Sequence, residues 1–186
     1  YFQSLDLEAM GVEWAHAPYD AAHPLDGGDA GLLSTSVGET AAGLGGDGRR
    51  WESMFGPPSR AFGKLAPGIM APMLRVPRHP MLLARFGLVA GPPPTIVAKA
   101  LRTEKARALF MGVAAHAFQP LTQPLVTGIG AGIIAAGHAV GWPVIRGGTG
   151  RFTDASIAML KAMGVRFETG QRITRLHELP RHDIVM

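Results

Sequence analysis

The sequence predicts an α+β protein, with a helical domain that carries a mixed sheet and a shorter closing segment of helix and strands. Three observations lead to this class. Residues 11–36 alternate between apolar and polar side chains, as short strands do, while residues 49–139 carry apolar side chains at helical spacing. After residue 149 a helical pattern gives way to alternation again, which adds the closing segment.

Composition indicates a folded chain with a substantial core. The 186 residues are 47% hydrophobic, which excludes disorder across the whole chain. There is no cysteine, so disulfides and thiolate metal sites are excluded, and a cytoplasmic location is compatible with the sequence. The seven histidines show no HxH or HxxxH spacing, so we expect no metal site.

The first predicted element is a hairpin or meander in an acidic, strand-rich part, residues 1–48. The segments GVEWAHA and AGLLSTS read as strands, separated by the turn signal HPLDGGDA. Residues 1–48 hold eight acids and no Lys or Arg, whereas the remainder holds 18 basic and six acidic side chains. The basic residues are spread among Met, Leu and Phe without clustered aromatics, so we expect no nucleic-acid partner.

The helical part, residues 49–140, contains four predicted segments. They are interrupted by prolines, which end or kink helices, and they cover residues 49–69, 79–89, 94–118 and 121–139. Within this part His116 and His138 could line a cavity, although we favour core positions for both.

Two apolar stretches raise the question of a membrane. Residues 125–145 are long enough to span a bilayer, but their many glycines favour a closely packed, buried helix. Residues 71–89 combine Arg75, Arg78 and Arg85 with Met, Leu and Phe. That composition suits either a helix in a peripheral membrane contact or a lid over a hydrophobic cavity, and both alternatives imply an apolar ligand.

The closing segment begins with the glycine-rich stretch GWPVIRGGTG, residues 141–150. Thr149 or Thr153 is expected to cap a helix with Phe152, Ile157, Leu160 and Met163 near one face, and Gly164 to end it. VRFETG and QRITRL then read as strands around a turn at Gly170, and HDIVM as the start of a third. An apolar run at residues 184–186 without a closing turn suggests that the sequence is part of a longer protein.

Common nucleotide and hydrolase motifs do not match. TGIGAGIIAAG has a misplaced third glycine and no preceding strand, so it is not a dinucleotide fingerprint, and neither GxxxxGK[ST] nor GxSxG occurs. The glycines of residues 147–150 therefore fit either an ordinary tight turn or a helix entry that offers N–H groups and the charge of Arg146 to a ligand.

A resemblance to a known family helps to choose between an ordinary turn and a ligand-binding helix entry at residues 147–150. The order W-P-x-x-R-G-G-T-G-x-F-T-D-A, followed by M-L-K-A-M-G-V-R-F-E-T-G-Q-R-I-T-R-L, resembles the phytoene dehydrogenase-like flavoproteins of the amine oxidase and phytoene desaturase superfamily. Phe152, Ile173 and Leu176 depart mildly from the family pattern. Residues 4–28 and 37–57 also look like this family's substrate-domain segments, so the resemblance covers nearly the whole chain and is most specific at residues 141–176.

The resemblance implies a substrate-binding domain over residues 1–145 and, over residues 146–186, helix and strands returning toward a Rossmann-like FAD domain whose other parts lie outside this sequence. It places Arg146, Gly147, Gly148, Thr149 and Gly150 near a noncovalently bound FAD, and matches Ile173 to a strand position whose backbone meets the adenine. No catalytic residue is implied, because hydride abstraction needs orientation and exclusion of water more than a protein nucleophile.

The expected function is therefore part of an FAD-dependent oxidoreductase that oxidises or desaturates a hydrophobic, isoprenoid- or lipid-like substrate by hydride transfer to flavin. We expect this chain to be inactive without the remaining FAD domain. The alternative is a noncatalytic module of the same fold that binds a hydrophobic ligand or a membrane. A homo-oligomer is compatible with either function, and the sequence gives neither the substrate nor the electron acceptor.

Overall fold

The computed structural model describes residues 5–71 and 76–185 and shows an α+β fold that is 53% helical. The chain divides into two compact units. Residues 15–144 form the larger one, called here the helical unit, and residues 1–14 with 145–186 form the other, called the small unit. Residues 1–14, assigned from the sequence to the first domain, thus cluster with the closing segment.

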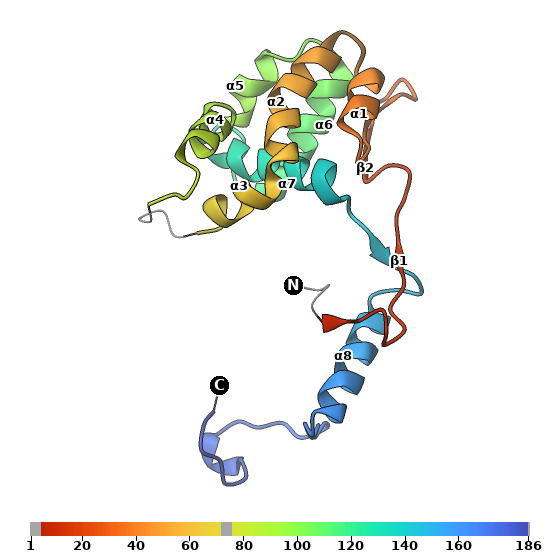
Figure 1. The fold of residues 1–186 in the computed structure, drawn as a ribbon, viewed down its shortest axis with the longest axis vertical. Coiled ribbons are helices and arrows are strands. Elements are labelled where there is room, and N and C mark those ends of the chain that lie inside the picture. The colour runs from red at the N-terminus through yellow and green to blue at the C-terminus, as the bar shows by residue number, and fades with distance from the viewer. Residues whose placement is uncertain (1–4, 72–75, 186) are drawn as a thin grey trace. The chain divides into compact units, whose positions relative to one another are not determined.

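The helical unit holds the first seven helices of the described residues, and the small unit holds the eighth (Figure 1). The helices are α1 (Val37–Gly43), α2 (Gly48–Arg60), α3 (Phe62–Ile69), α4 (Pro80–Ala90), α5 (Pro94–Lys99), α6 (Glu104–Ala114), α7 (Val126–Val140) and α8 (Gly150–Ala162). Short 3₁₀ turns occur at Gly45–Asp47, Ala115–Ala117 and Leu176–Glu178.

Two small two-stranded sheets complete the fold. The strands β2 (Ala21–Pro24) and β3 (Ala30–Leu33) pair antiparallel, with Ala21 opposite Leu33. Their turn is closed by hydrogen bonds from Leu25 N to Asp29 O (2.8 Å) and from Gly28 N to Leu25 O (3.0 Å). A hairpin thus forms within residues 11–36, as expected, but the strand expected at GVEWAHA, residues 11–17, is not part of it. The other sheet pairs β1 (Trp14–Ala15) with β4 (Val144–Ile145).

The core of the helical unit lies where α2, α6 and α7 pack together. Trp51 and Phe55 from α2 are fully buried, and their ring centroids are 4.5 Å apart. Phe110 of α6 and Ile134 of α7 are fully buried against them. Burying one such side chain contributes about 1.5–3 kcal/mol, so these few large residues dominate the stability of the unit.

A glycine permits the close approach of α6 and α7. A Cβ atom built on Gly130 would lie 2.7 Å from the Cα atom of Ala114, which is closer than packed carbon atoms approach. Gly132, on the same helix, has only an ordinary contact at 3.5 Å with the Ile69 Cδ1 atom. The glycines that made residues 125–145 a poor membrane span thus include one that helix packing requires.

The small unit has a core of its own around α8. Leu7, Val12 and Ala155 are buried there, and Phe152 packs against them. As expected, α8 begins directly after Thr149 and is followed by Gly164 with a left-handed backbone (φ +89°). Neither expected threonine cap forms, because no side-chain hydrogen bond caps the first turn.

The strands expected after α8 are absent from the described part of the small unit. Residues 165–170, 171–175 and 182–185 are irregular, and the side chains of Val165, Phe167 and Ile173 are 42–43% exposed. An isolated hairpin is marginal in water, and these segments have no third strand or apolar surface to pack on. The alternating pattern is therefore not enough to produce strands in this chain.

The helical part differs from the sequence prediction in detail. The segment 94–118 is divided into α5 and α6 by a bend at residues 100–103. The backbone N–H groups of Arg102 and Thr103 hold this bend by donating to the Asp47 carboxylate. The expected segment 49–69 is likewise two helices, and 121–139 begins only at Val126. Helix α1 was not expected within the strand-rich acidic part; Ser36 caps it by accepting from Glu39 N.

The buried-helix alternative for residues 125–145 is confirmed, since α7 places Ile134, Ala135 and His138 in the core. Within residues 5–71 and 76–185, no helix has both the length and the apolar character needed to cross a bilayer. Part of the proposed 71–89 segment, residues 72–75, lies outside the described residues, and the rest includes most of α4.

The two α7 glycines give a matched test of helix packing. We expect Gly130→Ala to lower the free energy of unfolding by about 1–3 kcal/mol, because the added methyl group collides with α6. Gly132→Ala should raise it by up to about 1 kcal/mol, since alanine favours the helix and the space is open. Urea denaturation of both variants measures the difference, and equal effects would contradict this packing.

Candidate functional site

The loop at residues 145–150 is a tight turn that leads into α8. Gly148 N donates to Ile145 O (2.9 Å), and Gly147, the third residue of this turn, has φ +83°. A type II turn requires a positive φ at that position, and Gly148 follows with φ +91°. The chain needs glycine at positions 147 and 148 because side chains disfavour this backbone.

Arg146, the cation expected in this loop, forms an ion pair with Glu13 of the same unit. Arg146 Nε donates to Glu13 Oε1 (2.6 Å), and Arg146 N donates to Glu13 O (2.9 Å). Both side chains are well exposed, at 65% and 63%, so the pair contributes at most about 1 kcal/mol. The contact holds the entry to the loop and leaves the Arg146 guanidinium partly satisfied within the protein.

The backbone beyond Arg146 is open to a ligand. A Cβ atom built on Gly148 or Gly150 would meet nothing within 4 Å, and one on Gly147 would meet only the Arg151 side chain at 3.6 Å. Among the described residues, the N–H groups of Thr149 and Gly150 have no hydrogen-bond acceptor. Free N–H groups beside open space fit the approach of an electron-rich or anionic group, as a flavin nucleotide would require.

Ile173 is not brought to this loop by any hydrogen bond within residues 5–71 and 76–185. It follows the opposite end of α8, in an irregular segment, and is 43% exposed. A 13-residue helix is about 20 Å long, so the residues flanking its two ends are widely separated unless the chain turns back. Residues 146–150 therefore form one consecutive turn, and the structure gives no hydrogen bond that joins Ile173 to it.

Sequence reasoning missed the buried polar contacts of the helical unit. Trp51 Nε1 donates to His138 Nε2 (3.0 Å), and His138 Nδ1 lies 2.8 Å from Ser34 O. The indole N–H can only donate, so His138 Nε2 accepts and the proton of the neutral ring is on Nδ1. This chain of hydrogen bonds joins α2, α7 and the end of β3. Because the partners are 87 and 104 residues apart, no local pattern signals them.

The core position predicted for His138 is confirmed, and the one predicted for His116 is wrong. His138 is a buried core residue, as expected; burial lowers its pKa, and hydrogen bonding to Ser34 offsets this only in part. The core position expected for His116 is wrong, because that residue is exposed at the end of α6 and only its Nδ1 atom lies near Gly112 O (3.3 Å).

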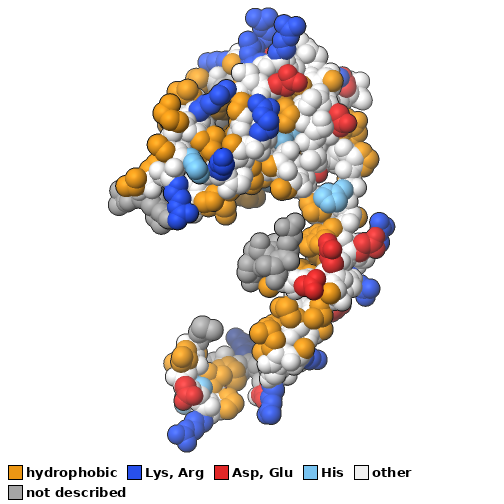
Figure 2. Space-filling view, in the orientation of Figure 1, with side chains coloured by type: hydrophobic (Ala, Val, Ile, Leu, Met, Phe, Trp, Pro, Cys, Tyr) orange, Lys and Arg blue, Asp and Glu red, His pale blue; other side chains and the backbone are white. Residues whose placement is uncertain are grey.

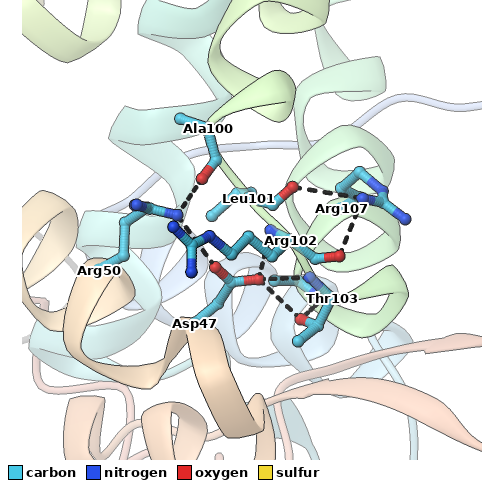
Figure 3. Close-up of polar contacts among 8 residues, drawn as sticks. Asp47, Arg50, Ala100, Leu101, Arg102, Thr103 and Arg107 are labelled. Atoms are coloured by element: carbon cyan, nitrogen blue, oxygen red, sulfur yellow. Dashed lines mark hydrogen bonds and ion pairs between the residues drawn. The ribbon is translucent and has the colours of Figure 1, made fainter.

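A second buried polar centre is Asp47, which precedes α2. Its Oδ2 atom accepts from Arg102 N (2.7 Å), Thr103 N (2.6 Å) and Thr103 Oγ1 (2.9 Å), as Figure 3 shows. Burial by itself would raise the pKa of Asp47, but the hydrogen bonds from Thr103 and Arg102 outweigh it and hold the pKa below its usual value. The carboxylate thus stays charged and fixes the start of α6 against the start of α2.

No group of three or more metal-ligating side chains occurs in the part of the chain that the structure describes. The chain matches no protein-family model, no curated protein and no solved structure.

The His138 contacts make stability depend on pH. Because the folded-state pKa of His138 is below the unfolded value of 6.5, the unfolded chain binds the proton more tightly. Stability is therefore full above about pH 6.5 and decreases as the pH falls below that value. His23, whose pKa is also lowered by burial and by His116, adds to the same trend.

We expect His138→Gln to cost about 1–3 kcal/mol at neutral pH and to reduce the loss of stability between neutral and mildly acidic pH. His177→Gln, an exposed control in the small unit, should change neither quantity appreciably. Urea denaturation over this pH range measures both. An unchanged pH dependence in His138→Gln would show that His138 is not held neutral.

Proposed function

We propose that this chain is the substrate-domain part of an FAD-dependent oxidoreductase of the phytoene dehydrogenase-like type. The observation that carries the proposal is the 141–176 sequence motif together with the backbone of its glycine turn. Two successive left-handed glycines place the first N–H groups of α8 beside open space. The first N–H groups of any α-helix lack intrahelical acceptors, so the support comes from the sequence motif taken together with the open space beside Gly148 and Gly150.

In this proposal the loop residues Gly147, Gly148, Thr149 and Gly150 lie against the flavin, with their backbone N–H groups as donors. FAD would supply the hydride acceptor for oxidation or desaturation of a hydrophobic substrate. Arg146 positions the loop through Glu13. The remaining FAD-binding elements are supplied by sequence outside these 186 residues.

A hydrophobic substrate or a membrane surface is supported by the apolar face of α4. Met81 and Leu88 are 82% and 79% exposed, and their spacing of seven residues places them on one helix face. Arg85 is exposed on the same face between them, and its long side chain could keep the charge in water while Met81 and Leu88 contact an apolar surface. The same observation favours the second candidate, a noncatalytic module that binds a hydrophobic ligand or a membrane.

Flavin content tests the oxidoreductase proposal. The longest protein that the gene encodes should purify with the visible absorption of bound flavin, and Gly148→Val should lose most of it, because valine cannot readily adopt the left-handed backbone. Ala158→Val, an exposed position in α8, controls for the added β-branched side chain. A colourless protein that FAD does not reconstitute would contradict the proposal and favour the binding module.

Vesicle binding tests the α4 surface. We expect Met81→Ser with Leu88→Ser to weaken sedimentation with phosphatidylcholine–phosphatidylserine vesicles by about tenfold or more, since each side chain gains about 1.5–3 kcal/mol when fully buried. As a control, Ile96→Ser with Val140→Ser removes two other apolar side chains of the helical unit, which are 51% and 64% exposed. Equal loss in both pairs, or no binding by the unaltered chain, would contradict a membrane role for α4.

A further inference from the structure

A basic hollow lies at the start of α2, within the helical unit. It has a volume of about 370 Å³ and is lined by Gly46, Arg49, Arg50, Ser53 and Arg102. Residues about fifty positions apart in the sequence meet there, and Figure 2 shows Lys and Arg side chains gathered at the upper edge of this unit. It is a shallow depression that is largely open to solvent.

The positive charge of the hollow is only partly neutralised by the protein. Arg50 pairs with Asp47 at 3.3 Å, whereas Arg49 and Arg102 form no ion pair with any described acid. The nearby acids Glu52 and Glu104 do not line the hollow. Arg49 and Arg50 occupy the first turn of α2, and Asp47, directly before the helix, supplies the negative charge that the helix dipole favours there.

The buried carboxylate of Asp47 fixes the backbone around the hollow. Its hydrogen bonds to Arg102 N and Thr103 N hold residue 102 beside the first turn of α2. Arg50 Nη1 bridges Asp47 and the carbonyl oxygen of Ala100, and Arg107 Nη1 donates to Arg102 O (3.0 Å), as drawn in Figure 3. The backbone that carries the arginines is therefore held in place before a ligand binds. This lowers the conformational entropy that is lost on binding.

We propose that Arg49, Arg102 and Ser53 bind the phosphate group of a phosphate ester. Guanidinium groups donate two parallel hydrogen bonds to phosphate oxygens, and the serine hydroxyl supplies one more donor. Two unpaired guanidinium charges match the roughly −1.5 to −2 charge of a phosphate monoester at neutral pH. The hollow leaves room for the organic part of the ester. Its source is either a soluble phosphorylated molecule or a lipid headgroup.

Calorimetric titration at fixed ionic strength tests this site in the 186-residue chain. The probes are inorganic phosphate and, separately, phosphatidylcholine vesicles with and without phosphatidic acid. Arg49→Gln with Arg102→Gln should weaken binding by about tenfold or more, since hydrogen bonds to charged groups contribute about 1.5–3 kcal/mol. Ser53→Ala should weaken it less, and thermal melting checks that each variant folds.

Arg166→Gln with Arg172→Gln is the matched control, because it removes the same charge from exposed positions of the small unit. Saturable binding of inorganic phosphate that only the Arg49/Arg102 pair weakens supports the site with a soluble ligand. Binding that appears only with phosphatidic acid vesicles and shows the same selectivity supports it with a lipid headgroup. Absence of saturable binding to either probe, or equal weakening by both arginine pairs, would overturn the proposal.

Discussion

The buried hydrogen-bond chain from Trp51 through His138 to Ser34 is the contact on which the helical unit most depends. Trp51 is fully buried and His138 is 7% exposed, so their polar atoms have no alternative partner in water. An unsatisfied buried polar group costs about 1–3 kcal/mol, which makes any displacement of α2, α7 or the β3 terminus unfavourable. The chain of contacts therefore selects one arrangement of elements that are distant in the sequence.

Asp47 adds a second constraint at the start of α2. Trp51 ties the first half of the helix to α7, while Asp47 ties the residues before it to the bend between α5 and α6. With both contacts made, α2 cannot rotate about its axis without breaking one of them. Arg49 and Arg50 are thereby directed to the surface beside Arg102. The contacts of Trp51 and Asp47 thus bring together the arginines that line the basic hollow.

Much of the helical unit could be predicted from local sequence, because periodicity and prolines act over a few residues. The α4 segment and the turn between β2 and β3 follow from such local signals, as does the left-handed Gly164 in the small unit. The contacts of Asp47 and His138 could not be predicted, since their partners come from distant segments.

At the candidate loop, glycine spacing indicated a tight turn, and the structure adds the Arg146–Glu13 pair, which no spacing rule predicts. The alternation in residues 165–176 failed because a strand also needs a partner, which local pattern does not supply.

The protonation of His138 tests the account most directly. Two-bond hydrogen–nitrogen NMR correlation of the imidazole rings distinguishes the Nδ1–H tautomer, the Nε2–H tautomer and the charged ring. At neutral pH we expect His138 to be neutral with its proton on Nδ1, donating to Ser34 O while Nε2 accepts from Trp51. A charged ring, or one protonated on Nε2, would contradict the buried hydrogen-bond chain and the arrangement of α2 that depends on it.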